Sequence, residues 1–301
     1  MKQSKEIWIC SNSAIDSLEY PKEIKVLRST ISFNSSTKVY EDYTDMNSGM
    51  FYQHLQNSPD DIPKTAYVSL GKIDLLLENA IQRGIEDIIV IVISSELSGL
   101  YKFFVNYAHF NHDKPTKIHP FDSQTVIYAE SFMALTAFNM IQDGNSVDEV
   151  FKILNVIRDN NQLYFAVDTL KYLVLNGRLS KSSGMIGNFL KMKPLLHLSG
   201  GKVVPLEKAR TSRIALKRLI EHYFENTINK NIITYISHAD NLDESEKIKK
   251  TILDRYPNRT IIICPLSPVV GSHAGPRTVA IGTIDLDALS TVKPSYFSFI
   301  K

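Results

Sequence analysis

A helix–strand–helix unit in the first third of the chain constrains the fold most strongly. Apolar residues recur at helical spacing over Ile73–Ile81 and stop before Gly84. The continuous apolar run "DIIVIVI" (Asp87–Ile93) follows, and a serine-rich turn then opens a new helix at about Gly99. A short, β-branched strand between two helices is typical of a parallel sheet that helices cover on both faces. The unit therefore predicts an α/β protein.

The remaining chain continues this alternation, without repeats or low-complexity tracts. Strands are expected in "EIWIC" near the N-terminus and over Leu163–Val167, and a hairpin is expected around Gly200 and Gly201. Amphipathic helices are expected over about 212–228 and 242–255. Both halves of the chain thus contain strands and helices.

The distribution of charge divides the chain into two parts. Residues 1–165 carry 14 Lys and Arg against 21 Asp and Glu, and residues 166–301 carry 20 against 11. Because single cores stop growing near about 250–300 residues, we predict an N-terminal α/β domain over 1–165 and a basic C-terminal α/β domain over 166–301.

Basic residues concentrate in residues 171–218, where 11 Lys and Arg accompany one acid, Glu207. The segment is either a solvated basic face or a surface for an anionic partner, which could be a phosphate, a membrane or an acidic protein. Nucleic acid is not expected, because few aromatic residues are present for base stacking.

Other features narrow the class of protein. No stretch approaches the roughly 18 uninterrupted apolar residues of a membrane-spanning helix, so we expect a cytoplasmic protein. Cys10 and Cys264 each end an apolar run and are predicted to be buried thiols rather than a disulfide. Neither a metal-binding cluster nor a P-loop occurs in the sequence, so no metal is expected and no nucleotide site is visible.

The stretch "VISSELSGLY" is a candidate anion site. Ser94, Ser95 and Ser98 stand where a buried strand gives way to a helix. Unpaired backbone N–H groups and the positive end of the helix dipole would favour a carboxylate or phosphate there. The alternative is an ordinary serine N-cap. The stretch is not a nucleophile elbow, because GxSxG is absent.

Two arginines and one histidine add further candidates. Arg178 follows a predicted helix, and Arg210 directly precedes another. Each could lie on the surface, but together with the basic segment they favour an anion pocket. His273 stands in "VVGSHAGPRT" and is open to four interpretations: a catalytic base, a metal ligand, a donor to an anion or a plain loop residue.

Taken together, these stretches resemble the DegV family. The segments "PKTAYVS", "SSELSGLY", "NGRLSKSSGMIG", "KPLLHLSGGKVVPLEKART" and "VVGSHAGP" occur in the order and approximate spacing of that family's signatures. The resemblance implies two α/β domains of the DegV type that hold one long-chain fatty acid between them, without a cofactor. It also implies a lipid-binding subunit of a bacterial fatty acid kinase in phospholipid synthesis. Such a subunit is not an enzyme by itself and presents the carboxylate to a separate ATP-binding subunit that forms acyl phosphate.

The resemblance also assigns roles to individual residues. Thr65 and Ser95 match the family threonine and serine that hold the fatty-acid carboxylate, and His273 lies beside this head group as a donor. Arg178 and Arg210 match paired arginines that are associated with the kinase subunit and its phosphate.

The acyl chain needs only apolar volume. The apolar residues of "MIGNFL" (Met185–Leu190) and "SFMALTAF" (Ser131–Phe138) are candidates for its tunnel, with core packing as the alternative role. Transient contact of the basic segment with an anionic membrane is expected during ligand exchange.

Four positions depart from the family pattern. Asn12 stands where the family has aspartate, and Ala66 removes a hydroxyl beside the head-group site. Glu130 and the nearby Ile127 bring larger side chains where the family has small residues, which would narrow or shorten the lipid tunnel. Arg277 replaces a glycine, adds positive charge near the head group and removes the freedom to adopt a positive φ. These departures bear on chain-length preference and on coupling to a kinase.

Two other functions remain open from the residues. One is an independent enzyme that acts on a small phosphorylated or carboxylated metabolite at the same anion site. The other is a lipid carrier or sensor without a kinase partner. Co-purifying fatty acid separates the lipid-binding functions from the enzyme.

Overall fold

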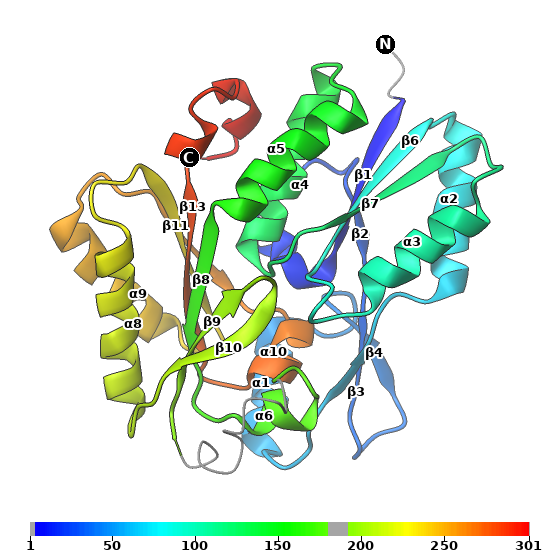
Figure 1. Cartoon of the computed structure of the whole chain (residues 1–301). Coiled ribbons are helices and arrows are strands. Elements are labelled where there is room, and N and C mark those ends of the chain that lie inside the picture. Colours follow the sequence, from blue (N-terminus) through cyan, green and yellow to red (C-terminus); the bar gives the residue numbers. More distant parts are fainter. Residues whose placement is uncertain (1–3, 180–191, 301) are drawn as a thin grey trace.

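The computed structural model describes residues 4–179 and 192–300, and this part of the chain forms alternating layers of helices and sheets (Figure 1). The first sheet of the described part is wholly parallel. In spatial order it contains β2 (Lys25–Leu27), β1 (Lys5–Cys10), β6 (Asp87–Val92) and β7 (Lys117–Asp122).

A second, mixed sheet is built mainly from the C-terminal half of the chain. In spatial order its strands in the described residues are β10 (Lys202–Glu207), β9 (Leu195–Ser199), β8 (Asn161–Ala166), β13 (Val279–Asp285), β11 (Ile232–His238) and β12 (Ile261–Pro265). A small antiparallel sheet lies below the first one in Figure 1 and contains β4 (Val39–Glu41), β3 (Thr30–Ser32) and β5 (Lys64–Ala66).

Helices cover the outer faces of both large sheets and fill the space between them (Figure 1). The outer face of the parallel sheet packs on α2 (Leu70–Arg83) and α3 (Leu100–Phe110), and that of the mixed sheet packs on α8 (Ser212–Asn226) and α9 (Leu242–Arg255). The remaining helices of the described part are α1 (Ser48–Asn57), α4 (Tyr128–Gln142), α5 (Val147–Asp159), α6 (Lys171–Leu175) and α10 (Pro268–Ala274), with short 3₁₀ turns η1 (Ser11–Ser13), η2 (Ile15–Ser17), η4 (Asp287–Leu289) and η5 (Pro294–Phe297).

The apolar run of β6 shows why the sheets need cover on two faces. Ile89 and Ile91 point into the large central core, whereas Ile88 and Val90 point to the opposite face, under α2 and α3. Successive side chains of a strand alternate between its faces, so a continuous apolar run is stable only when both faces are buried. The prediction of a parallel, two-sided α/β sheet is confirmed.

Helix α4 lies between the two large sheets and is buried almost all round. Phe132 and Met133 are fully buried, and the helix contacts β1, β6 and β13. A helix that is buried on nearly every side and is mostly apolar, as here, belongs in a core rather than on a surface. Because α4 contacts strands of both sheets, a single central core joins the two halves of the molecule.

The domain boundary at 165/166 remains a prediction. Strand β8 spans this position and pairs with β13 and β9, so the chain enters the mixed sheet at Asn161. Cys10 and Cys264 are buried free thiols, as predicted. Among the described helices, none has the length and apolar character that crossing a membrane requires.

The β9–β10 hairpin meets the end of β6 across the two sheets. Ser94 Oγ donates a hydrogen bond to the Gly201 carbonyl oxygen at 2.8 Å. Gly201 has φ +77°, and a Cβ at this residue would lie 2.3 Å from Ser94 Oγ. The predicted hairpin is confirmed, and its glycine permits an approach that no other residue type could make.

Candidate functional site

A cavity of about 460 Å³ lies between the inner face of the mixed sheet and the segments that follow β1 and β6 of the parallel sheet. This volume falls within the roughly 300–1,000 Å³ of small-molecule sites. Its walls come from the turn before α3, the start of α4, the inner face of the mixed sheet, and α10. Apolar side chains form most of the wall, among them Leu163, Phe165, Leu198 and Val203.

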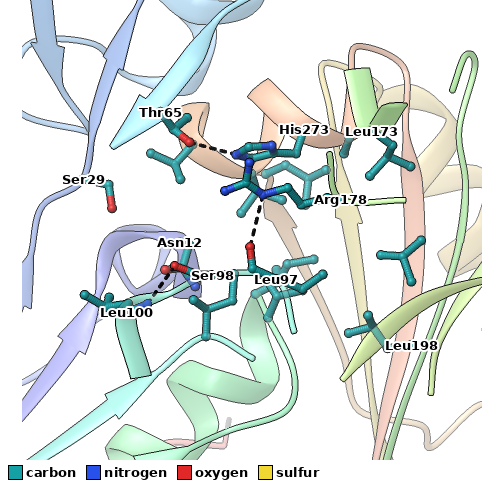
Figure 2. A pocket seen from close by; sticks show the side chains of 18 of the residues that line it. Asn12, Ser29, Thr65, Leu97, Ser98, Leu100, Leu173, Arg178, Leu198 and His273 are labelled. Atoms are coloured by element: carbon teal, nitrogen blue, oxygen red, sulfur yellow. Dashed lines mark hydrogen bonds between the residues drawn. The ribbon is translucent and has the colours of Figure 1, made fainter. Parts of the chain in front are cut away.

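Polar side chains gather at one end of the cavity. Figure 2 shows Thr65, His273, Arg178, Ser98 and Asn12 around the same space, whereas Leu173 and Leu198 lie on the other side. These residues come from β5, α10, the segment after α6, the turn before α3, and η1. The tertiary structure therefore brings five distant segments together at a polar end of an apolar cavity.

The polar end also lies at an opening of the cavity. Ala66, Tyr67 and Gly99 line the cavity and are exposed to solvent. The apolar wall formed by Leu163 and Phe165 is buried on β8. A ligand with a polar head and an apolar body would therefore bury its body and keep its head near solvent.

Thr65 and His273 form the best-defined contact of the site. Thr65 Oγ1 lies 2.9 Å from His273 Nε2. Burial and, to a smaller extent, the positive charge of Arg178 lower the pKa of His273 to about 3, so the imidazole is neutral. His273 Nδ1 is buried without a partner among the described residues.

This arrangement selects one tautomer of the neutral histidine. A buried N–H without a partner is costlier than an unpaired acceptor, so the proton belongs on Nε2 and Nδ1 carries none. His273 then donates to the Thr65 oxygen. The Thr65 hydroxyl hydrogen is left free to donate to a ligand in the cavity.

His273 lies on a helix and is therefore not a plain loop residue. Helix α10 begins with Pro268 after the N-cap Ser267 and includes His273 in its last turn. The flanking glycines are needed for packing. A Cβ at Gly271 would lie 2.4 Å from the Tyr52 hydroxyl, and one at Gly275 would lie 2.5 Å from the Tyr172 ring.

Arg178 supplies a positive charge to the cavity. Its Nε donates to the Leu97 carbonyl oxygen at 3.1 Å, and its Nη1 donates to the Asn176 carbonyl oxygen at 2.5 Å. Burial lowers its pKa, but a guanidinium keeps its proton in proteins. No carboxylate of the described residues pairs with it, so an anionic ligand would offset the cost of its burial.

The serine turn contributes a different residue from the one that the family pattern indicated. Ser95 is exposed and is not part of the cavity wall, and its backbone N–H donates to Asp122. Ser98, three residues later, lines the cavity next to the N-terminus of α3. A carboxylate contact by Ser95 remains a prediction, whereas the geometry favours Ser98.

The two arginines are not brought together at the cavity. Arg178 lines it, but Arg210 is exposed before α8 and is absent from the lining. The kinase- and phosphate-facing role of both arginines remains a prediction, for Arg178 about a residue of the cavity wall and for Arg210 about a surface residue. Within residues 4–179 and 192–300, no three His, Cys, Asp or Glu side chains are placed to hold a metal ion.

Two of the four residues that depart from the family pattern, Asn12 and Glu130, are hydrogen-bonded to each other. Asn12 Nδ2 donates to Glu130 Oε2 at 2.6 Å. Glu130 is fully buried behind Asn12 rather than in the cavity wall, so it does not narrow the cavity directly. Ile127 does line the cavity, at a φ of +68° that is strained for a β-branched residue. Ala66 lies at the opening.

The expectation for Arg277 is wrong on both points. Arg277 adopts φ +62° although it is not glycine. Its exposed side chain lines a separate cavity of about 50 Å³ with Asp168 and Ser212, so it adds no charge to the head-group end. There burial raises the pKa of Asp168, but hydrogen bonds from Ser212 and Lys193 and, least of all, the charge of Arg277 lower it below its usual value.

The predicted acyl tunnel is only partly within the described residues. Ser131–Ala137 on α4 are buried and none of them lines the cavity, so they pack the core. Met185–Leu190 lie outside the described residues. The cavity instead uses the inner faces of β8, β9 and β10. Alternate apolar residues such as Leu163 and Phe165 were the sequence signal for this wall.

Known proteins share this fold and much of this sequence. Residues 9–286 match the family model for uncharacterised proteins of the DegV family. Protein DegV of Bacillus subtilis is 28% identical over 276 residues, which cover 88% of this chain and 96% of that protein.

Solved structures agree with this match. The fatty acid binding DegV family protein of Streptococcus agalactiae has a TM-score of 0.83 at 25% identity, over 93% of this chain and 98% of that one. DegV of Bacillus subtilis, a fatty acid binding protein, has a TM-score of 0.82 at 25% identity, over 94% and 99%. With its family model matched over nearly the whole length and its fold shared with these proteins, the chain belongs to the DegV family.

Proposed function

We propose that this protein binds one long-chain fatty acid in the cavity between its sheets, with the carboxylate at the polar end. The observation that carries this proposal is a mostly apolar cavity with five polar side chains gathered at one end, beside lining residues that are exposed to solvent. Thr65, Ser98 and Arg178 would hold the carboxylate, and His273 would orient the Thr65 hydroxyl. The fatty acids bound by the Bacillus and Streptococcus relatives support the same ligand class.

The energetics of such a ligand match the two ends of the cavity. A buried carboxylate costs several kcal/mol unless it is paired and hydrogen-bonded, and hydroxyl donors with a guanidinium meet this need. Each buried CH₂ group of the acyl chain contributes about 0.8 kcal/mol before the entropy of binding is subtracted. The apolar wall therefore supplies affinity, and the polar end supplies orientation.

We further propose that the bound carboxylate is presented to a separate ATP-binding kinase subunit, which transfers a phosphoryl group to it and forms acyl phosphate. The opening beside Ala66, Tyr67 and Gly99 supports this proposal, because the head group would lie near solvent while the chain stays buried. The protein would bind and orient the substrate, and the partner would supply the ATP. The interior of a bacterial cell is where such a partner would be met.

An enzyme for a small phosphorylated metabolite fits the site poorly. The walls formed by Leu163, Phe165, Leu198 and Val203 offer no hydrogen-bond partners for a compact polar molecule. A lipid carrier without a kinase partner would use the same cavity. Acyl-phosphate formation in the presence of a kinase subunit distinguishes the carrier from the kinase subunit.

The direct test is extraction of the purified protein under denaturing conditions, followed by mass spectrometry of any bound lipid. We expect about one fatty acid per chain in the wild type. Thr65→Val removes the hydroxyl that faces the carboxylate and should weaken fatty-acid binding by roughly 1–3 kcal/mol. Thr65→Ser is the matched control, because it keeps the hydroxyl group and should retain the wild-type affinity. A wild-type protein that carries no fatty acid and binds none when it is added would contradict the proposal.

A further inference from the structure

Helix α4 carries a buried carboxyl group next to the head-group end that the proposed function does not use. Glu130 lies in the first turn of α4 and is fully buried. Its Oε2 accepts the hydrogen bond from Asn12 Nδ2, whereas its Oε1 is buried without a partner among the described residues. Asn12 itself lines the cavity near Ser98 (Figure 2). Glu130 can therefore act on a ligand through Asn12.

The surroundings of Glu130 disfavour its ionised form. Burial raises its pKa well above the usual range, the hydrogen bond from Asn12 on η1 opposes this, and the charge of Asp122 at the end of β7 raises the pKa further. Burial raises the pKa of the Cys10 thiol on β1, and the charge of Glu130 raises it further. Across the cavity, His273 on α10 and Arg178 after α6 face the head-group end.

The side-chain amide of Asn12 can meet a carboxyl group in two orientations. Toward an ionised carboxylate, only the amide nitrogen can form the hydrogen bond, so the amide oxygen turns to the cavity. Toward a protonated carboxyl group, the amide oxygen can accept the O–H, and the amide N–H₂ then turns to the cavity. In the second orientation, the acidic proton of Glu130 is hydrogen-bonded to the amide oxygen. If Asn12 kept the first orientation while Glu130 was protonated, this proton would be buried without a partner, as Oε1 is in the structure.

We propose, on the basis of the proposed fatty-acid site, that Glu130 is a positioning residue that decides which end of the Asn12 amide faces the bound head group. With Glu130 protonated, Asn12 presents N–H donors and favours a carboxylate. With Glu130 ionised, Asn12 presents an oxygen, which repels a carboxylate. The protein then releases a fatty acid more readily as Glu130 loses its proton.

This inference predicts selectivity between charged and neutral head groups. A long-chain alcohol can both donate and accept a hydrogen bond, so either orientation of Asn12 suits it. A carboxylate only accepts, so its affinity alone depends on the orientation. The ratio of the affinities for palmitate and hexadecanol should therefore fall as the pH rises.

Asp42 is another buried carboxyl group near η1, and its titration needs a control. Burial raises the pKa of Asp42 to about 7, and it lies beside Ser11 in η1 and the backbone of Val269. The charge of Asp16 raises the pKa of Asp42 further, and the charge of Arg28 lowers it. Asp42→Asn removes this titration and leaves Glu130 in place.

The experiment is displacement of a fluorescent fatty acid by palmitate and by hexadecanol, from about pH 6 to about pH 9. In the wild type, the affinity for palmitate should fall by about tenfold relative to hexadecanol, the size of one charge-assisted hydrogen bond. In Glu130→Gln, the side chain opposite Asn12 does not titrate, so this relative fall should disappear. Asp42→Asn should keep the wild-type profile.

Each outcome bears on a different claim. Parallel pH profiles for palmitate and hexadecanol in the wild type would overturn the role of Glu130, and this comparison needs no variant to fold. The same relative fall in wild type and Glu130→Gln would also overturn it, while tight palmitate binding would leave the proposed function intact. If neither lipid bound at any pH, the proposed function would fail and this inference with it.

Discussion

At the scale of single residues, the polar end of the cavity can bind an anion because its buried polar groups have few hydrogen-bond and ionic partners within the protein. His273 is neutral and uses its one N–H on Thr65, so the threonine hydroxyl is free for a ligand. Arg178 is held by two backbone carbonyl groups, and no described carboxylate neutralises it. These donors are held in place by the protein but still have hydrogen-bonding capacity or positive charge available, which favours binding of an anion.

Arg277 is a residue-scale prediction for stability. Its φ of +62° is a strained backbone conformation for a residue with a Cβ. Arg277→Gly should therefore raise the free energy of unfolding by about 1 kcal/mol, after the greater entropy of glycine in the unfolded chain is subtracted. Urea unfolding would measure this. Arg277→Ala is the matched control, because it removes the charge but keeps the strain, and an equal gain in both variants would refute the explanation.

At the scale of elements, the parallel sheet, α4 and the β9–β10 hairpin show different degrees of predictability. The apolar run Ile88–Val92 predicted both the strand and its burial on two faces, because its alternate side chains point to opposite faces and all of them are apolar. The hairpin was visible from Gly200 and Gly201, but its contact with Ser94 was not. That contact joins two sheets, and turn chemistry specifies only the local chain.

The hairpin contact gives an element-scale prediction. Gly201→Ala should lower the free energy of unfolding by about 2 kcal/mol or more, because its Cβ would collide with Ser94 Oγ and its φ is positive. Gly200→Ala is the matched control, because Gly200 also has a positive φ but a Cβ there would meet nothing within 4 Å. It should cost only about 1 kcal/mol. Equal losses in the two variants would show that the Ser94 contact contributes nothing.

At the scale of the whole molecule, the cavity exists because the inner face of the mixed sheet lies opposite the segments that follow the parallel strands β1 and β6. Thr65 on β5 and His273 on α10 are 208 positions apart in the chain and meet at 2.9 Å. The acyl-chain wall comes from the mixed sheet, and the polar end draws on segments from both halves of the chain. Ligand binding should therefore stabilise the association of both sheets, because a ligand that binds only the folded state adds to its stability.

The two arginines test this division at the molecular scale. Arg178 lines the cavity, so Arg178→Ala should weaken palmitate binding by about 1.5–3 kcal/mol, the range for a hydrogen bond to a charged group. Arg210 is exposed and outside the wall, so Arg210→Ala should leave palmitate binding intact and lower only acyl-phosphate formation with an ATP-binding kinase subunit. Calorimetric titration and a coupled turnover assay measure the two effects. Full turnover in Arg210→Ala would remove that residue from the partner surface.

The sequence by itself determined the α/β class, the order of most elements, the buried thiols and the family, because periodicity, turn residues and motifs are local properties of the chain. Only the tertiary structure decided that Ser98 rather than Ser95 lines the cavity, that Arg210 lies outside it, and that Glu130 meets Asn12. These outcomes depend on which segments pack together and how each side chain is turned. Spacing along the chain carries little of that information, because packing of the two sheets joins residues that the sequence keeps far apart.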